Sequence, residues 1–459
     1  MSTEFDAIII GAGQAGPSLA GRLTAAGRRV ALIERKLFGG TCVNTGCKPT
    51  KTLVASAHAA HIARRAAEFG VGLSGAVTID MKTVKARKDA ISTQSREEIE
   101  AWLGGMAGCT VFRGQARFEA AGVVRVGEER LSAPQVFINV GGRAVTTGFP
   151  GFDQVTCLTN STILELEEVP RHLVVVGGSY IGLEFAQMYR RFGAEVTIVE
   201  RGPRLIQRED EDISAAIKQI LQDEGIRIRL DACCIGFRPE GADIAVSVDC
   251  QADAAPSIGS HVLLAVGRQP NTDDLGLDAA GVQVDARGYI RVDDELRTNI
   301  PGIWAMGDCN GRGAFTHTAY NDFEIIAANL LDGDKRRVSD RITAYGLYID
   351  PPLGRVGQTE AEVRRSGRPA LVGTRPMTKV GRAVEKAETK GFMKVIVDAQ
   401  SKAILGAAIL GVGGDEVVHS LLDTMYAGAP ATVVQRAVHI HPTVSELVPT
   451  LLSELRPLA

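Results

Sequence analysis

Short apolar runs that end at glycine turns are the dominant pattern of the chain. Residues 6–10 (DAIII) lead into the turn GAGQAG, a helical segment follows (PSLAGRLTAAG), and a second apolar run (RVALIE) ends in an acid. Buried parallel strands are typically such short apolar runs bounded by glycine. Residues 5–34, called the first unit below, therefore predict a strand, a helix and a second strand.

The whole pattern occurs a second time. Residues 172–200 (HLVVVGGSYIGLEFAQMYRRFGAEVTIVE), called the second unit below, again contain an apolar strand, a Gly-rich turn, a helix and a strand that ends in an acid. Residues 136–144 (VFINVGGRA) and 263–272 (LLAVGRQPNT) each predict a buried strand ending at a glycine turn, and residues 302–310 (GIWAMGDCN) predict one ending in an acid. Repeated units of this kind predict an α/β fold with parallel sheets.

The pattern changes near residue 341. Alternating strand patterns such as FMKVIVD and AILGAAIL precede a helix through GGDEVVHSLLDTMYAGA and the segment HIHPTVSELVPTLLSEL. These features predict an α+β segment with its own apolar faces. We expect domain boundaries near residues 145, 270 and 338.

Composition limits the function classes. A chain of 459 residues is too long for one hydrophobic core and suggests two to four domains. Its hydrophobic content of 45%, charged content of 23% and net charge of −3 give no electrostatic basis for binding nucleic acid or a membrane surface. The start MSTEFD is unlike a secretory signal, and no apolar run reaches the roughly 18 residues needed to span a bilayer. We therefore expect a cytoplasmic protein.

The first unit has the residues that a dinucleotide needs. Gly11, Gly13 and Gly16 form a GxGxxG pattern, and Glu34 lies 18 residues beyond Gly16. The first glycine allows the tight turn, the second lets backbone N–H groups reach a pyrophosphate, and the third lets helix and strand pack closely. Glu34 is placed to accept hydrogen bonds from an adenosine ribose.

The second unit repeats this arrangement with one change. Gly177 and Gly182 match the first and third glycines, and Glu200 lies 18 residues after Gly182, but Ser179 occupies the middle position. The backbone approach is therefore tighter there than in the first unit. Two units indicate two dinucleotides, one that stays bound and one that exchanges.

The stretch GGTCVNTGCKPTK places Cys42 and Cys47 five positions apart and Lys51 four positions further on. Zinc sites usually show two to four residues between paired cysteines and a second pair elsewhere. On a regular helix five residues rise about 7.5 Å, beyond the ~4.4–6.8 Å between Cα atoms that a disulfide tolerates. Asn44 and Gly46 permit the required distortion, so the stretch predicts a reducible cysteine pair at a helix start, where the thiolate pKa falls. No metal site is expected.

These motifs together resemble the class I pyridine nucleotide–disulfide oxidoreductases, the family of dihydrolipoamide dehydrogenase, glutathione reductase and mercuric reductase. The resemblance covers essentially the whole chain and includes GGTCVNTGCKPTK, YIGLE, AVGRQPNT, WAMGDC and HIHPTVSE in the family's order. It implies a homodimer with FAD and NAD(P)H as cofactors. The implied domains are an FAD-binding domain at residues 1–145 and 271–338, an NAD(P)H-binding domain at 146–270 and a dimerisation (interface) domain at 339–459.

The resemblance also implies roles for single residues. Glu184 is implied to pair with Lys51 beside the flavin, and Tyr180 to cover the flavin until nicotinamide displaces it. Electrons would pass from flavin to Cys47, while Cys42 exchanges with the substrate. The implied FAD contacts are Gly11, Gly13, Gly16, Glu34, Lys51, Gly141, Asp308 and Ala319, and the implied NAD(P)H contacts are Gly177, Tyr180, Gly182, Glu200 and Gly267.

A base for the thiol chemistry is implied at the C-terminal motif. His441 and Glu446 of HIHPTVSE match the family's histidine–glutamate pair, in which the acid orients the imidazole. In the family this pair comes from the other subunit, so dimerisation is part of the active site. His439 is expected to be a surface or loop residue.

The substrate remains open at this stage. Ser179 and the TCVN segment favour a mercuric reductase-like enzyme acting on a metal ion or a disulfide, although no cysteine follows Cys309. HPTVSE favours dihydrolipoamide dehydrogenase, whereas Lys48 is unusual for it. A redox sensor without turnover is a third class. Glu200 favours NADH over NADPH, and the vicinal Cys233–Cys234 pair is expected to be two buried strand cysteines.

Overall fold

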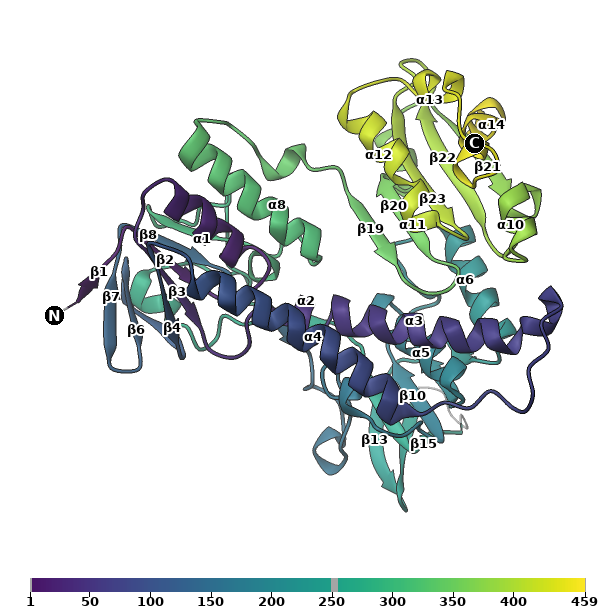
Figure 1. Cartoon of the computed structure of the whole chain (residues 1–459), viewed down its shortest axis with the longest axis horizontal. Helices are drawn as coiled ribbons and strands as arrows, with labels where there is room; N and C mark the ends of the chain where they lie inside the picture. The colour runs from purple at the N-terminus through teal and green to yellow at the C-terminus, as the bar shows by residue number, and fades with distance from the viewer. Residues whose placement is uncertain (1, 249–254, 459) are drawn as a thin grey trace.

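The computed structural model describes residues 2–248 and 255–458, which form three regions, each built on its own main sheet (Figure 1). The first region holds a five-stranded parallel sheet of order β18-β8-β2-β3-β4. Its strands are β2 (Ala7–Ile10), β3 (Val30–Glu34), β4 (Cys109–Arg113), β8 (Gln135–Ile138) and β18 (Ile303–Ala305).

This sheet is buried on both faces because its strands are almost wholly apolar. Ile8 and Ile10 of β2 face a four-stranded sheet of order β1-β7-β6-β5, whereas Ala7 and Ile9 face the helices α1 and α8. The bounds of these elements are α1 (Gly16–Ala25), α8 (Thr316–Ala327), β1 (Thr3–Glu4), β5 (Ala116–Ala120), β6 (Val123–Val126) and β7 (Glu129–Ser132).

The second region repeats the design with a four-stranded parallel sheet of order β12-β11-β10-β16. Helices α5 and α6 contribute to the core on one face, and the antiparallel strands β13 and β14 to the core on the other, with β15 paired to β14. The elements are β10 (His172–Val176), α5 (Tyr180–Phe192), β11 (Glu195–Val199), α6 (Glu211–Asp223), β12 (Arg227–Arg229), β13 (Ile235–Glu240), β14 (Asp243–Val248), β15 (Ser257–Gly259) and β16 (His261–Leu264). The short strands β9 (Gly142–Ala144) and β17 (Arg268–Pro270) pair where the chain passes between the first two regions.

The third region is a six-stranded antiparallel sheet of order β19-β20-β23-β22-β21-β24. The predicted strands at FMKVIVD and AILGAAIL are its central pair, β22 and β23, and the predicted helix at residues 413–429 forms α11 and α12, with Val418 between them. The elements are β19 (Ala344–Leu347), β20 (Leu353–Gly357), α9 (Glu360–Ser366), β21 (Ala370–Pro376), α10 (Gly381–Glu385), β22 (Phe392–Asp398), β23 (Ile404–Leu410), α11 (Gly414–Val417), α12 (His419–Tyr426), α13 (Thr432–Arg436), α14 (Val448–Ser453) and β24 (Arg456–Pro457).

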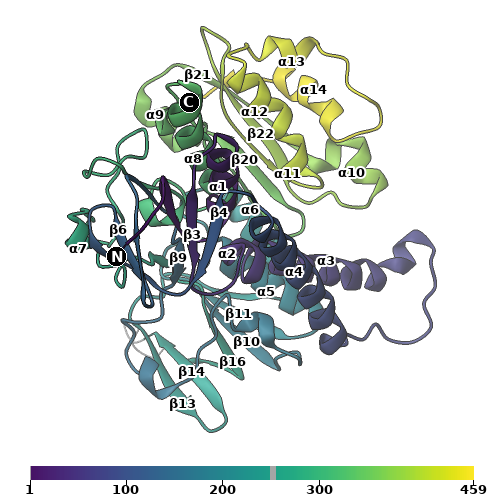
Figure 2. The same cartoon turned by 60° about the vertical axis from the view of Figure 1, so that its left-hand side comes forward.

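Two long helices cross the centre of the molecule. They are α3 (Cys47–Arg64), which follows the short α2 (Gly40–Asn44), and α4 (Met81–Gly104). Figure 2 shows α3 and α4 side by side, projecting away from the first sheet. Helix α3 begins beside the first sheet and packs on α5 of the second region, so its side chains can contact both regions. None of the helices in the described residues is long and apolar enough to cross a membrane.

Candidate active site

A cavity of about 1460 Å³ lies where the three regions meet. Its walls are formed by the redox stretch that contains Cys42 and Cys47, by the starts of α5 and α8, and by strand β19. It brings together eleven of the residues singled out from the sequence: Gly11, Gly13, Glu34, Cys42, Cys47, Lys51, Gly141, Tyr180, Glu184, Asp308 and Ala319.

The first Gly-rich turn forms one end of this cavity. Gly11 has φ +109°, and a Cβ there would lie 2.3 Å from the carbonyl oxygen of Asn139, so no other residue fits without a shift of backbone. A Cβ on Gly16 would lie 2.2 Å from the carbonyl oxygen of Gly11. Glu34 accepts hydrogen bonds from the backbone N–H groups of Ala12 (2.8 Å) and Lys36 (2.7 Å). The acid therefore holds the turn at the ends of β2 and β3.

The two cysteines lie on different helices, as the spacing argument predicts. Cys42 is on α2 and Cys47 is the first residue of α3, and the helical path is broken between them at Gly46, which has φ −138° and ψ −117°. A Cβ on Gly46 would lie 2.8 Å from the carbonyl oxygen of Thr41, so the break needs a glycine. Both cysteines are free thiols, the reduced form of the predicted pair.

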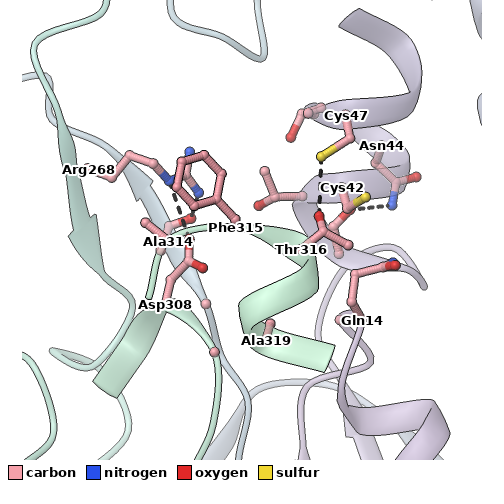
Figure 3. Close-up of a pocket in the computed structure, with 18 of the residues that line it drawn as sticks. Gln14, Cys42, Asn44, Cys47, Arg268, Asp308, Ala314, Phe315, Thr316 and Ala319 are labelled. Atoms are coloured by element: carbon pink, nitrogen blue, oxygen red, sulfur yellow. Dashed lines mark hydrogen bonds and ion pairs between the residues drawn. The ribbon is translucent and has the colours of Figure 1, made fainter. Parts of the chain in front are cut away.

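The environment of the thiols separates their pKa values. A hydrogen bond from Cys42, a hydrogen bond from Thr316 and the Lys51 cation lower the pKa of Cys47 to about 6, against the opposing effect of burial. The Cys47 sulfur lies 3.2 Å from Thr316 Oγ1 (Figure 3). The hydrogen bond to Cys47 and burial raise the pKa of Cys42. At neutral pH the pair therefore holds a thiolate at Cys47 and a thiol at Cys42.

Lys51 and Glu184 form an ion pair across two regions. Lys51 Nζ on α3 lies 2.6 Å from Glu184 Oε2 on α5, and the Glu184 side chain is only 5% exposed. The other carboxylate oxygen accepts the backbone N–H of Tyr348 at 3.0 Å, and the Lys51 ammonium lies 4.6 Å from the centre of the Tyr348 ring. A buried carboxylate is stable only when it is paired in this way. Lys51 is therefore held in the cavity at one turn from Cys47.

The segment after β18 brings a further acid, Asp308, into the cavity. Asp308 lies 3.6 Å from the Arg268 guanidinium (Figure 3), and burial raises the pKa of this carboxyl group. Arg268 also donates a hydrogen bond to the carbonyl oxygen of Gly142. Gly141 has φ +63°, and Ala319 lies on the first turns of α8.

A dinucleotide carrying a flavin fits this cavity on two structural grounds. Gly13 lies in the turn before α1 and carries no side chain that would cover the helix start, the position that favours a pyrophosphate. Asn44 Oδ1 is buried without a hydrogen-bond partner in the described residues and needs a donor.

The second Gly-rich turn repeats the first. Gly177 has φ +114°, and its Cβ would lie 2.4 Å from the carbonyl oxygen of Ala265. A Cβ on Gly182 would lie 2.1 Å from the carbonyl oxygen of Gly177. Glu200 accepts the backbone N–H groups of Gly178 (2.6 Å) and Gly202 (2.7 Å). Gly177, Gly182, Glu200 and Gly267 are not among the residues that line the cavity, so this turn forms a separate surface.

The histidine and glutamate of the C-terminal motif lie apart from the cysteines of the same chain. His441 Nδ1 lies 2.8 Å from Glu446 Oε2, so the predicted pairing is present. The His441 side chain is 80% exposed and does not line the cavity. Val438 and Ile440 beside it are 99% and 80% exposed. His439 is half-buried and lies in the loop after α13, in line with the expected surface or loop position.

Some residues of the site escaped the sequence analysis. Thr316, which contacts Cys47, belongs to no recognised motif. Arg268, which pairs with Asp308, lies within the recognised AVGRQPNT but was given no role there. Tyr345 lines the cavity and has no sequence signal. The expectation for Cys233 and Cys234 was wrong. Both are exposed and lie in the loop between β12 and β13 rather than in a buried strand.

Comparison with known proteins agrees with this arrangement. Residues 5–322 match the family model described as pyridine nucleotide-disulphide oxidoreductase, and residues 343–452 match its dimerisation domain. The chain is 36% identical to the probable pyridine nucleotide-disulfide oxidoreductase RclA of Escherichia coli, over 98% of this chain and 99% of the relative. A solved structure titled as the Cu(II) complex of that HOCl-induced flavoprotein disulfide reductase covers 97% of this chain and 99% of its own, with a TM-score of 0.89.

Two relatives with other names are each 32% identical to this chain. A mercuric reductase of Streptomyces lividans is 32% identical over 97% of this chain and 94% of the relative. A dihydrolipoyl dehydrogenase of Haloferax volcanii is 32% identical over 98% of this chain and 95% of the relative. Identity alone therefore does not select a substrate. The chain belongs to the pyridine nucleotide-disulfide oxidoreductase family, enzymes that use FAD and NAD(P)H and carry a dimerisation domain.

Proposed function

We propose that this enzyme takes electrons from NADH and delivers them, through Cys42 and Cys47, to a metal ion such as Cu(II) or to a disulfide substrate. The observation that carries the proposal is the pair of thiols at the cavity, with a lowered pKa at Cys47 and a raised one at Cys42. FAD, when bound, supplies the step that accepts a hydride from the nicotinamide and passes two electrons to the cysteine pair.

The cofactors are proposed to divide between the first two regions. The FAD-binding domain comprises residues 1–145 and 271–338, the NAD(P)H-binding domain 146–270 and the interface domain 339–459. FAD lies along the cavity, with its pyrophosphate at Gly11 and Gly13 and its ribose at Glu34. Gly16 keeps α1 close to β2, and Gly141, Asp308 and Ala319 complete the site. The nicotinamide coenzyme lies on Gly177, Gly182, Glu200 and Gly267, and Tyr180 covers the flavin until the nicotinamide arrives.

The cysteines have different tasks. When Cys42 and Cys47 form a disulfide, its Cys47 sulfur would accept the two electrons from the flavin, and Thr316 and the Lys51 cation would then stabilise the Cys47 thiolate that this reduction leaves. Cys42 exchanges with the substrate. Because the Lys51–Glu184 pair is held across two regions, it keeps a positive charge beside the position where negative charge develops during reduction.

A base for Cys42 is proposed to come from a second copy of the chain. The pairing with Glu446 holds the His441 imidazole in one orientation while its other nitrogen stays exposed. The exposed Val438 and Ile440 beside it are apolar surface that a partner would cover. The partner's His441 would then remove the proton from Cys42, whose raised pKa makes a base necessary.

NADH is the proposed coenzyme. Both carboxylate oxygens of Glu200 are held by backbone N–H groups at the end of β11, so the negative charge is fixed where a 2′-phosphate would lie. Arg201 is exposed next to it, but the repulsion from Glu200 opposes NADPH.

Metal ions are favoured as acceptors by the relative whose structure is titled as a Cu(II) complex. Dihydrolipoamide is the second candidate because the Haloferax relative, 32% identical to this chain, is named for it. Lys48 argues against lipoamide, since its ammonium group donates to Ser95 Oγ at 2.5 Å and places a charge beside the redox stretch.

The test is a parallel assay of acceptors. The purified flavoprotein is given NADH or NADPH together with lipoamide, glutathione disulfide, Cu(II) or Hg(II), and coenzyme oxidation is followed. We expect turnover with a metal ion and little with lipoamide. Fast reduction of lipoamide alone would make the protein a dihydrolipoamide dehydrogenase, and a single bleaching of the flavin without turnover would make it a redox sensor.

A further inference from the structure

Four rings from the three regions meet at the cavity. Tyr345 of β19 stacks on Phe315, which precedes α8, with centroids 5.7 Å apart and planes at 13°, and Phe315 stacks in turn on His317. Tyr180, the first residue of α5, meets this stack edge-on, at 5.5 Å from Tyr345 and 5.9 Å from Phe315. Phe315 directly precedes Thr316, the residue that contacts Cys47, and Figure 3 shows Phe315, Thr316 and Cys47 at the same pocket. The cluster therefore lies beside the redox cysteines.

Tyr345 is anchored at its far end by a buried carboxylate. Its hydroxyl donates to Glu209 Oε1 at 2.6 Å. Glu209 also accepts two hydrogen bonds from Arg355, at 3.0 and 2.6 Å, and the side chains of Glu209 and Arg355 are 0% and 1% exposed. Paired buried charges of this kind resist movement, because separating them leaves a desolvated charge.

The anchor continues into the third sheet. Arg355 also pairs with Asp210 at 2.8 Å. The Lys394 ammonium, only 1% exposed, pairs with Asp210 at 3.1 Å, Asp212 at 2.6 Å and Glu360 at 2.7 Å. These three carboxylates approach one another closely enough for a cation, and Lys394 supplies that cation. The charged network therefore binds the segment after β11 to β20 and β22, and it fixes Tyr345.

Tyr180 has no comparable anchor. Its hydroxyl is buried without a hydrogen-bond partner in the described part of the chain, and burial raises its pKa to about 12. Its described ring contacts are the edges of Phe315 and Tyr345 and the Arg208 guanidinium at 5.3 Å. The cluster thus consists of one ring, Tyr180, that only its neighbouring side chains hold and a stack that the ionic network anchors.

We propose that Tyr345 is a positioning residue that sets how readily Tyr180 leaves its closed position, and thereby the affinity for NADH. This inference rests on the proposed function, in which nicotinamide displaces Tyr180. The contact of Tyr345 with Tyr180 stabilises the closed position, so part of the binding energy of NADH is used to break it. An aromatic pair of this type changes such an equilibrium about 2- to 10-fold.

The experiment is anaerobic stopped-flow reduction of the holoenzyme by increasing NADH. Tyr345→Leu removes the ring contact, and we expect the Kd for NADH to fall about 2- to 10-fold while the limiting reduction rate changes less than twofold. Tyr345→Phe keeps the ring and loses only the hydroxyl, so its Kd should lie between those of wild type and Tyr345→Leu. This milder variant keeps the test valid if leucine destabilises the fold.

A double-mutant comparison separates positioning from a general structural effect. In a Tyr180→Leu background the closed ring is already absent, so adding Tyr345→Leu should leave the Kd for NADH where it is. An unchanged Kd in the single variants, or an equal fall of the Kd in the Tyr180→Leu background, would overturn the proposal. Absence of any flavin reduction by NADH in the wild type would instead remove the proposed function, and this inference with it.

Discussion

The first and second units of this molecule use the same backbone device. The first glycine has a positive φ in both, +109° at Gly11 and +114° at Gly177, and a Cβ there would meet a carbonyl oxygen at 2.3 or 2.4 Å. Glu34 and Glu200 each accept two backbone N–H groups that hold the turn. As dinucleotide turns the two units are therefore nearly interchangeable.

The units differ in the segment that follows the acid. In both, that segment returns to the turn: Gly39 N–H donates to the carbonyl of Ala12 at 2.8 Å, and Ile206 N–H donates to the carbonyl of Gly178 at 2.9 Å. After the first unit the chain enters α2 and brings Cys42 into the cavity. After the second unit the chain supplies Glu209 and Asp210, which pair with Arg355 and Lys394 in the buried ionic network. Each turn is proposed to bind a cofactor, and the segment that follows the acid decides what else the unit contributes to the site.

Removal of Cys42, the proposed exchange thiol on the segment after the first unit, should have the largest effect on activity. In Cys42→Ser the hydroxyl cannot replace the thiol, so we expect turnover with a disulfide acceptor to fall by at least about 10³-fold. Reduction of the flavin by NADH should stay intact, because Cys42 lies after that step. Steady-state assays with glutathione disulfide or lipoamide, beside anaerobic flavin reduction, measure the two separately.

Cys234→Ser is the matched control for this prediction. Cys234 is an exposed free thiol that does not line the cavity, so its loss should leave turnover unchanged. Loss of both flavin reduction and turnover in Cys42→Ser would contradict the assignment of Cys42 as the exchange thiol.

Alanine at the first glycine of each unit should separate the two cofactors. Gly11→Ala forces a left-handed residue against Asn139, and we expect purified protein with less than about a tenth of the normal FAD. Gly177→Ala creates the equivalent clash at Ala265, and we expect normal FAD content with NADH affinity about 10-fold lower or worse. Flavin absorbance and NADH titration check these outcomes. Equal FAD loss in both variants would mean that the second turn supports the first cofactor.

Features formed by residues close together in the sequence could be predicted from the sequence. Both units follow from apolar runs, glycines and a closing acid, which are local requirements of one turn. The broken helix between Cys42 and Cys47 follows from helix rise and disulfide reach, and the break occurs at Gly46. The contact of Lys51 with Glu184 was accessible only through the family resemblance, because 133 residues separate them.

Contacts between distant segments could not be predicted. Thr316 lies 269 residues from the cysteine that it contacts, and Tyr345 lies 136 residues from Glu209. Neither has a spacing that identifies it, since each reaches its partner only when separate sheets pack together. The wrong expectation for Cys233 and Cys234 has a related cause. Two apolar residues beside a strand, here Cys233 and Cys234, can belong either to the strand or to the adjoining loop, and the sequence does not distinguish the two.

The charge of the second acid should control the choice of coenzyme. Glu200→Gln removes the negative charge while the amide oxygen still accepts one backbone N–H, so we expect the NADPH to NADH ratio of kcat/KM to rise about 10-fold. Glu34→Gln, the matched change in the first unit, should leave this ratio unaltered. A ratio that responds equally to both changes would show that the two acids do not serve different cofactors.

The segments after the two acids should also differ in their response to pH, since Cys47 follows the first unit and Asp210 follows the second. The hydrogen bond from Cys42, then Thr316 and Lys51, lower the pKa of Cys47 to about 6. The thiolate is therefore present above this pKa and is lost as the pH falls through it. The thiolate fraction should change from about 90% at pH 7 to about 10% at pH 5. Asp210 stays ionised over this range, since Arg355 and Lys394 hold its pKa low despite burial.

Ultraviolet thiolate absorbance of the reduced protein, with Cys47→Ser as the blank, measures the midpoint. Thr316→Val removes a hydrogen bond to the thiolate and should move the midpoint to higher pH. A midpoint near that of an ordinary cysteine in the wild type would contradict the proposed activation of Cys47.

The smallest effect is expected at the middle position, where the two sequences differ. Ser179 has φ −113°, a conformation open to any residue, so the second turn does not require glycine there. Ser179→Gly makes the turn match the first unit but increases the freedom of the unbound backbone, and we expect NADH affinity to fall only about 2- to 5-fold. Titration with NADH measures it. A gain in affinity would instead mean that the serine side chain obstructs the pyrophosphate, and that the second unit is built for weaker binding of a coenzyme that must exchange.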